Sequence, residues 1–500
     1  MSHVNSPARV LLVALALGWS VDVLFYGKFL GLSFPLFVLL LMIALFGLGW
    51  LEGVRPARRN LWLLIPLMFF TGMAFVRASP FLTFLNVVTS LALLGLIAHF
   101  YAAGRPDRLG LIGFPFVLLC TVGNALVRPA PLMSASVDLG AARERGGRNL
   151  VPVVRGLLLA LTVLLLFTAL LASADLVFAR YVRDILTFDI RSDVLEWMRR
   201  GFIILVAAWF LAGGLDYGLS RGAISPEPGF LDRALDRLGR LLSLGFVEAA
   251  TLLSSVDMLF LSFVAVQFTY FFGGRANITI KGYTYAEYAR RGFFELVVVS
   301  VLTLGLILCL RELTRRDTDQ RARVLNSLSS LMVGLVLVIL ASAFQRLRLY
   351  EAAYGYTQLR LYSHVFMVWL ALVFVWFLVT LWCWPDWFAI GAFVAAMGFL
   401  ATLNAINPDA FIVRQNLTRY QATDKLDAYY LTTLSEDAVP ALVRALDQTS
   451  GDERTVLVRH LGHRLQRMDE STHWQSWPSF HLARRRAYAL LAQHRAQLGQ

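Results

Sequence analysis

The chain has 500 residues, of which 58% are apolar and 16% charged, and its mean hydropathy is +0.63. Soluble proteins carry charge on about a quarter of their residues, so this composition excludes a protein with a mostly water-facing surface. The net charge of +13 comes almost entirely from arginine, since lysine occurs only at Lys28, Lys281 and Lys425. The arginines stand in short clusters between apolar runs, as loop cations do beside membrane spans, and we expect no nucleic-acid partner.

The first four-fifths of the chain is a series of long apolar runs. A helix needs about 20 apolar residues to cross the hydrocarbon core, where its backbone must satisfy its own hydrogen bonds. The sequence therefore predicts an all-α fold, a polytopic transmembrane helical bundle of about 12 spans. The predicted spans are Val10–Phe25, Leu32–Leu51, Leu61–Phe75, Phe81–Phe100, Leu109–Val127, Val154–Phe178, Phe202–Leu219, Phe246–Phe272, Phe293–Leu310, Ser327–Phe344, Tyr362–Cys383 and Phe388–Leu403.

The last part of the chain is polar and mixed in charge. We divide the sequence into a transmembrane domain, residues 1–405, and a small soluble helical tail, residues 406–500. The run Ser435–Pro440 predicts the first turn of a helix, because proline costs little there and carboxylates meet the positive end of the helix dipole. Further tail helices are expected over Glu453–Met468 and Phe480–Leu491.

Polar residues at membrane depth are the main candidates for function, because each costs a few kcal/mol unless it is satisfied. Asp257 lies near the middle of its predicted span and is our first choice, with an arginine from a neighbouring helix as the structural alternative. On the opposite face, Glu248, Ser255 and Ser262 recur at every seventh position. This hydroxyl face predicts close packing against another helix. Gln267 is a further polar candidate on the same span.

The loop that follows this span is aromatic and charged. Tyr285, Glu287 and Arg290 are candidate ligand-binding residues, and the tyrosines suit the headgroup level of a bilayer. Two interpretations remain open for this loop, binding of a lipid headgroup or polar ligand and plain interfacial anchoring.

Motifs of known enzymes are absent from the sequence. It contains no H-E-x-x-H, G-x-S-x-G, P-loop or G-x-G-x-x-G pattern, and the tail histidines lack companions at ligand spacing. We expect no cofactor and no metal, and a protein that is not an enzyme is favoured.

Several motifs carry a family resemblance that covers nearly the whole chain. They are the stretches Asp22–Gly27, Leu171–Phe178, Glu248–Gly274, Tyr285–Leu296, Asn407–Ala410, Leu426-Asp427 and Ser435–Leu442. Together they resemble the bacterial integral-membrane family called domain of unknown function 4173. The resemblance implies a helical protein of the bacterial cytoplasmic membrane and assigns no catalytic residues. The basic loop around Arg55 leads us to expect both termini in the cytoplasm under the positive-inside rule, although later basic loops give opposing evidence.

Three functions fit these features. The first is a transporter or lipid-handling protein with a polar intramembrane site near Asp257 and membrane lipids as partners. The second is a membrane sensor or assembly subunit whose tail binds a soluble protein. The third is an intramembrane transferase that uses Asp22 or Asp257.

Overall fold

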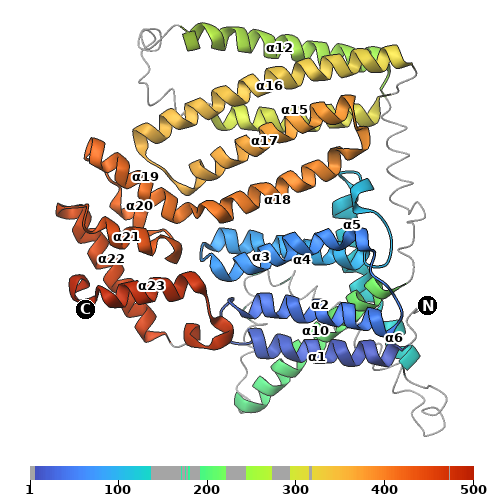
Figure 1. Ribbon diagram of the computed structural model, residues 1–500, viewed down its shortest axis with the longest axis vertical. Coiled ribbons are helices and arrows are strands. Elements are labelled where there is room, and N and C mark those ends of the chain that lie inside the picture. The colour runs from blue at the N-terminus through green and yellow to red at the C-terminus, as the bar shows by residue number, and fades with distance from the viewer. Residues whose placement is uncertain are drawn as a thin grey trace.

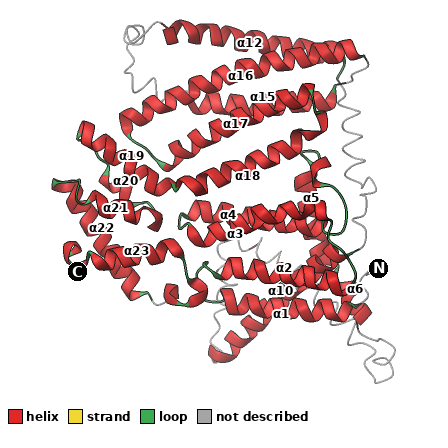
Figure 2. Cartoon of the chain, viewed as in Figure 1, coloured by secondary structure: helices red, strands yellow, loops and turns green. Residues whose placement is uncertain are grey.

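The computed structural model describes residues 6–136, 192–220, 244–272, 293–314, 318–471 and 473–499, with a few isolated positions between 171 and 180. Every regular element in these residues is a helix, so the predicted all-α class is confirmed (Figure 2). Eleven helices in this part of the chain are long and apolar enough to cross a membrane. The predicted span Val154–Phe178 lies outside the described residues.

The helices of the bundle have the following bounds: α1 (Pro7–Phe25), α2 (Ser33–Leu51), η1 (Arg58–Leu63) with α3 (Leu64–Val76), α4 (Pro80–His99), α5 (Gly113–Val127) with α6 (Pro129–Ser136), α10 (Ser192–Leu219), α12 (Phe246–Phe272), α15 (Phe293–Leu313), α16 (Asp319–Tyr354), α17 (Gln358–Trp382) and η3 (Pro385–Trp387) with α18 (Phe388–Ile406). Their outward faces carry large apolar side chains; Leu12, Trp50 and Ile65 are 67%, 82% and 74% exposed. Such a surface is stable in hydrocarbon, and the chain is a multi-pass helical membrane protein.

The bundle is built around two apolar cores. Helices α1 to α5 and α10 surround the first, and α12, α15, α16 and α17 surround the second. Helix α18 lies between the two groups, since it contributes Leu400 to the first core and Phe388 to the second (Figure 1).

The bundle has two ends, which we name by what lies there. At the tail end, the turns after α1, α3 and α16 contact the C-terminal helices. Helix α1 begins at the opposite, N-terminal end (Figure 1). If the helices span a bilayer, the start of α1 and the tail face opposite sides of it. The expectation that both termini lie in the cytoplasm stays a prediction, although this arrangement does not favour it.

The tail consists of short helices, as predicted. They are α19 (Pro408–Thr423), α20 (Ala428–Thr432), η4 (Glu436–Ala438), α21 (Val439–Ala445), α22 (Gly451–Glu470), η6 (Trp477–Ser479) and α23 (Leu482–Gln493). The Ser435 hydroxyl accepts a bond from the Asp437 N–H at 3.3 Å, which caps η4 in the manner expected of a helix start. Asn407, with a left-handed φ of 55°, separates α18 from α19 and marks the predicted domain boundary.

The tail and the bundle share one continuous apolar core. Leu82, Leu361 and Leu403 of the bundle lie in the same buried cluster as Leu431 and Leu457 of the tail. The tail is therefore a docked cap on the tail end of the bundle, and its apolar surface is buried by the spans themselves.

The α1–α2 turn is held by the segment that precedes α23. The Leu32 N–H donates to the Phe480 carbonyl at 2.8 Å, and the Phe29 N–H donates to the Ser479 hydroxyl at 3.1 Å. At Gly31 the two backbones approach so closely that an added Cβ would lie 2.5 Å from the Phe480 carbonyl oxygen. Glycine is required at this position because the obstructing atom belongs to a backbone.

Replacing this glycine should loosen the tail. We expect Gly31→Ala to cost about 1–3 kcal/mol, as overpacking of a close contact does, and to speed proteolysis of the tail. Thermal unfolding and limited proteolysis of the purified protein measure both effects. Gly47→Ala is the matched control, since a Cβ at Gly47 in α2 meets nothing within 4 Å. Equal stability of the two variants would contradict the prediction.

Candidate functional site

A buried carboxylate joins the tail to the α3–α4 turn. Asp437, at 7% exposure, accepts hydrogen bonds from the backbone N–H groups of Ala78 at 2.7 Å and Ser79 at 3.2 Å. These N–H groups directly precede α4, where a negative charge meets the positive end of the helix dipole. Arg77 lies 3.9 Å from the same carboxylate, and its Nε donates to the Asn404 carbonyl at 2.7 Å. Burial raises the pKa of Asp437 to about 6, although Arg77 and the Ala78 N–H act to lower it.

A second buried carboxylate continues this contact toward α17. Asp409 is fully buried at the start of α19 and accepts a bond from Gln358 Nε2 at 2.7 Å. Its other oxygen accepts from the Ser435 N–H at 3.0 Å and from the Ser435 hydroxyl at 2.5 Å. The Tyr430 hydroxyl accepts from the Gln358 N–H at 2.8 Å. These bonds fix the segment that contains Ser435 against the bundle.

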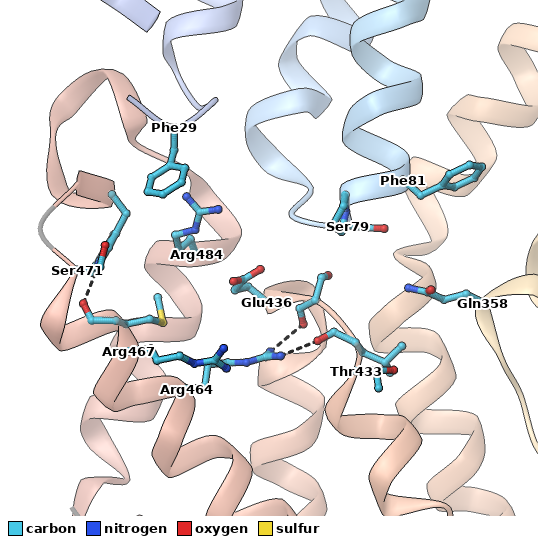
Figure 3. Close-up of a pocket in the computed structure, with 15 residues that line it drawn as sticks. Phe29, Ser79, Phe81, Gln358, Thr433, Glu436, Arg464, Arg467, Ser471 and Arg484 are labelled. Atoms are coloured by element: carbon cyan, nitrogen blue, oxygen red, sulfur yellow. Dashed lines mark hydrogen bonds between the residues drawn. The ribbon is translucent and has the colours of Figure 1, made fainter. Parts of the chain in front are cut away.

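A cavity of about 600 Å³ opens beside these contacts, between the tail and the tail end of the bundle (Figure 3). We call it the tail cavity. Its wall includes two phenylalanines from the bundle, Phe29 and Phe81, each 50% exposed. The opposite wall comes from the tail and contains Trp474. Both phenylalanines stand at the tail end of the bundle, Phe29 in the α1–α2 turn and Phe81 in the first turn of α4.

Three arginines make the tail wall of this cavity basic (Figure 3). Arg464 is held in place, because its guanidinium donates to the carbonyls of Leu434 at 2.8 Å and Ser435 at 3.3 Å. Arg484 lies over the Phe29 ring at 5.4 Å, and its Nη1 has no hydrogen-bond partner among the described residues. Arg467 is exposed, one helical turn along α22 from Arg464.

Two other titratable groups define the net charge of the cavity. Glu436 lines it and offsets one of the three positive charges. His481 is buried next to it, and burial, with a further effect of Arg484, lowers its pKa to about 4. The imidazole is therefore neutral at pH 7 and adds no charge, so the wall keeps a positive excess.

The predicted site candidates that the structure describes, Glu248, Asp257 and Gln267, do not line the tail cavity. Tyr285, Glu287 and Arg290 lie outside the described residues. Glu248 is exposed and accepts a bond from the Gly245 N–H at 2.9 Å, which closes the first turn of α12. Gln267 accepts a bond from the Ser342 hydroxyl of α16 at 2.9 Å and so joins two helices.

The predicted hydroxyl face of α12 points outward. Thr251, Ser255 and Ser262 are exposed, and the Ser255 and Ser262 hydroxyls donate to carbonyls of their own helix. The prediction that this face packs against another helix is therefore wrong for the described residues. The packed face is the opposite one, which contains Asp257, 4% exposed.

Asp22, offered as a transferase carboxylate, forms an ion pair with Arg200 at 2.6 Å.

The arginines of the tail cavity were missed from the sequence. Arg464 and Arg467 are spaced i, i+3 and share a helix face, which is a visible signal of a basic surface. Arg484 and Phe29 are more than four hundred residues apart in the chain, and only the docking of the tail brings them together.

The fold and the cavity define a multi-pass α-helical membrane protein whose C-terminal tail closes a basic cavity over one end of the bundle. A family model described as "Domain of unknown function (DUF4153)" matches residues 64–445, and the chain belongs to this family. The family expected from the motifs was number 4173, so the number differs; the two agree only in that the family is one of unknown function. Comparisons with curated proteins and with solved structures found no match.

The matched segment begins in α3 and ends with α21. It thus contains the docking residues Arg77, Asp409 and Asp437. The arginines of the tail cavity follow it in the chain.

The raised pKa of Asp437 predicts a pH dependence of stability. An unfolded aspartate has a pKa of about 3.9, so the folded form binds this proton more tightly than the unfolded chain. The stabilising contribution is then complete below pH about 4 and is lost as the pH rises through about 6. We expect Asp437→Asn to flatten the change in melting temperature over this interval. Scanning fluorimetry in detergent measures it, with the exposed Asp452→Asn as control; an unchanged slope in Asp437→Asn would refute the prediction.

Proposed function

We propose that this protein is a lipid-handling protein that binds an anionic amphiphile, with its negative headgroup in the tail cavity. The observation that carries the proposal is the pairing of a basic tail wall with half-exposed phenylalanines from the turns of the bundle. An amphiphile presents the matching surfaces, since its headgroup is charged and its chains are apolar.

Each part of the cavity has a physical role in this proposal. Arg484 lines the cavity beside Phe29, and its guanidinium can donate to a phosphate or carboxylate oxygen; charge-assisted bonds of this kind are the strong ones. Arg464 is already bonded to carbonyls and contributes a fixed positive charge. Phe29 and Phe81 contact the first carbons of the chains, which remain in the membrane. Glu436 disfavours a doubly negative ligand bound close to it.

The proposal is tested with short-chain lipids of equal chain length. Purified protein in detergent is titrated with dihexanoyl-phosphatidylglycerol, dihexanoyl-phosphatidylcholine or inorganic phosphate, and the thermal shift is measured. We expect stabilisation by the anionic lipid, little by the zwitterionic lipid, and little by phosphate because it buries no apolar surface. Stabilisation by phosphate alone would assign the cavity to a free anion and overturn the lipid proposal.

A double variant locates the binding. Arg467→Gln with Arg484→Gln should weaken binding of the anionic lipid at least about tenfold, since each charge-assisted bond contributes about 1.5–3 kcal/mol. The matched control is Arg459→Gln with Arg485→Gln, which removes the same charge from the exposed sides of the same two helices. If both double variants lost the same affinity, the loss would come from the lower overall charge, and the proposal that the lipid binds in the tail cavity would be wrong.

We further propose that the tail faces the non-cytoplasmic side of a bacterial cytoplasmic membrane. The structure supports this by sorting the connecting segments between the two ends of the bundle. At the N-terminal end, the described connecting segments and adjoining helix ends carry Arg55, Arg58, Arg59, Arg105, Arg108, Arg311, Arg321 and Arg323. At the tail end, the described connecting segments and adjoining helix ends carry Lys28, Arg77, Arg346, Arg348 and Arg360. The positive-inside rule places the more basic end in the cytoplasm.

Cysteine labelling tests this orientation. In a background where Cys120, Cys309 and Cys383 are replaced by serine, a single cysteine is introduced at Asp452 in the tail or at Gly110 at the N-terminal end. Both positions are exposed. A membrane-impermeant maleimide added to intact cells should label Asp452→Cys, and should label Gly110→Cys only after permeabilisation. The reverse pattern would place the tail in the cytoplasm.

A further inference from the structure

Three aspartates in the described spans are buried, and one of them differs from the others. Asp22 pairs with Arg200 at 2.6 Å and Asp216 pairs with Arg128 at 3.1 Å. Asp257 is 4% exposed, and neither of its carboxyl oxygens has a hydrogen-bond partner among the described residues. The paired aspartates lie near the ends of α1 and α10, whereas Asp257 lies near the middle of α12.

The surroundings of Asp257 are apolar. Its side of α12 packs against α16, and Leu253, Phe260 and Val264 lie in one buried cluster with Met332 and Val336. The charged residues of α12, α15 and α16 lie toward the ends of these helices, whereas Asp257 lies near the middle of α12. They are Glu248 on α12, Glu295, Arg311 and Glu312 on α15, and Asp319, Arg321, Arg323, Arg346, Arg348 and Glu351 on α16.

The energetics decide the protonation state. An ionised carboxylate without a partner in a medium of low dielectric costs far more than a neutral acid, and such groups take up a proton. The other two aspartates avoid this cost through an arginine. No described arginine reaches Asp257. The carboxyl of Asp257 is therefore expected to be protonated and neutral when α12 packs against α16.

We propose that Asp257 is a proton-binding site inside the membrane, in the seam between α12 and α16. Loss of the proton transfers it from the carboxyl to water and leaves an anion that this seam cannot hold. The ionised form then requires water or a cation to enter between the two helices. Helix α12 suits such a role because it lies at the edge of the bundle with its hydroxyl face outward (Figure 1).

A polar bond limits where the seam can open. Gln267 and Ser342 join α12 to α16 at 2.9 Å on the same packed face, toward the tail end. Between Asp257 and the N-terminal end, the face of α12 contains only the apolar Ala249 and Leu253 as buried residues. No residue of α12 lines the tail cavity, so this site is independent of the proposed lipid binding.

Infrared spectroscopy of the purified protein in lipid tests the proposal. The spectrum is recorded at pH 8, where Asp437, with a pKa of about 6, is ionised and gives no band of a protonated acid. We expect a carbonyl band of a protonated carboxylic acid at this pH, from Asp257. The band should disappear in Asp257→Asn and persist in Glu248→Gln, the exposed carboxyl on the same helix. Labelling with [4-¹³C]aspartate should shift the band in the wild-type protein, which assigns it to aspartate even if the variant fails to fold.

Two results would overturn the proposal. One is the absence of a protonated aspartate band from the wild type at pH 8, and the other is a band that survives in folded Asp257→Asn. Neither result bears on the short-chain lipid titration, so failure here and failure of the lipid proposal are distinguishable.

Discussion

The structure depends on one constraint, that a polar group in hydrocarbon must find a partner or lose its charge. The backbone meets the constraint by forming helices. The side chains meet it in pairs: Asn86 and Asn404 exchange two amide hydrogen bonds, of 2.9 Å and 2.8 Å, between α4 and α18. Two of the buried aspartates are neutralised by arginine. At Asp257 the same constraint is satisfied in the proposed way, by a proton.

The same constraint decides what was predictable. Span positions and the tail helices depend on local composition and capping, so the runs near Glu453 and Phe480 located α22 and α23 within a few residues. Partners depend on packing between distant segments. The periodicity of α12 correctly separated Asp257 from the hydroxyl face, yet it could not reveal which of the two faces meets α16. The tail cavity was beyond prediction for the same reason, since its walls come from both ends of the chain.

The tail is joined to the bundle by carboxylates that bind backbone N–H groups and by a common apolar core. Asp437 occupies the position of a helix-capping anion for α4, although it comes from another part of the chain. Because the family match spans Arg77, Asp409 and Asp437, the polar contacts that dock the cap belong to the matched region. The sequence predicted a small soluble helical tail, and the structure adds that the apolar core of this tail is continuous with that of the bundle.

The contact between Phe480 and the α1–α2 turn has a consequence for biosynthesis. A ribosome makes this turn about 450 residues before the strip around Phe480. The α1–α2 hairpin therefore remains, already inserted, with the polar N–H groups of Phe29 and Leu32 uncovered until that strip has been synthesised. A nascent chain halted before α23 would keep this turn open to proteases, so docking of the strip protects a hairpin that was made much earlier.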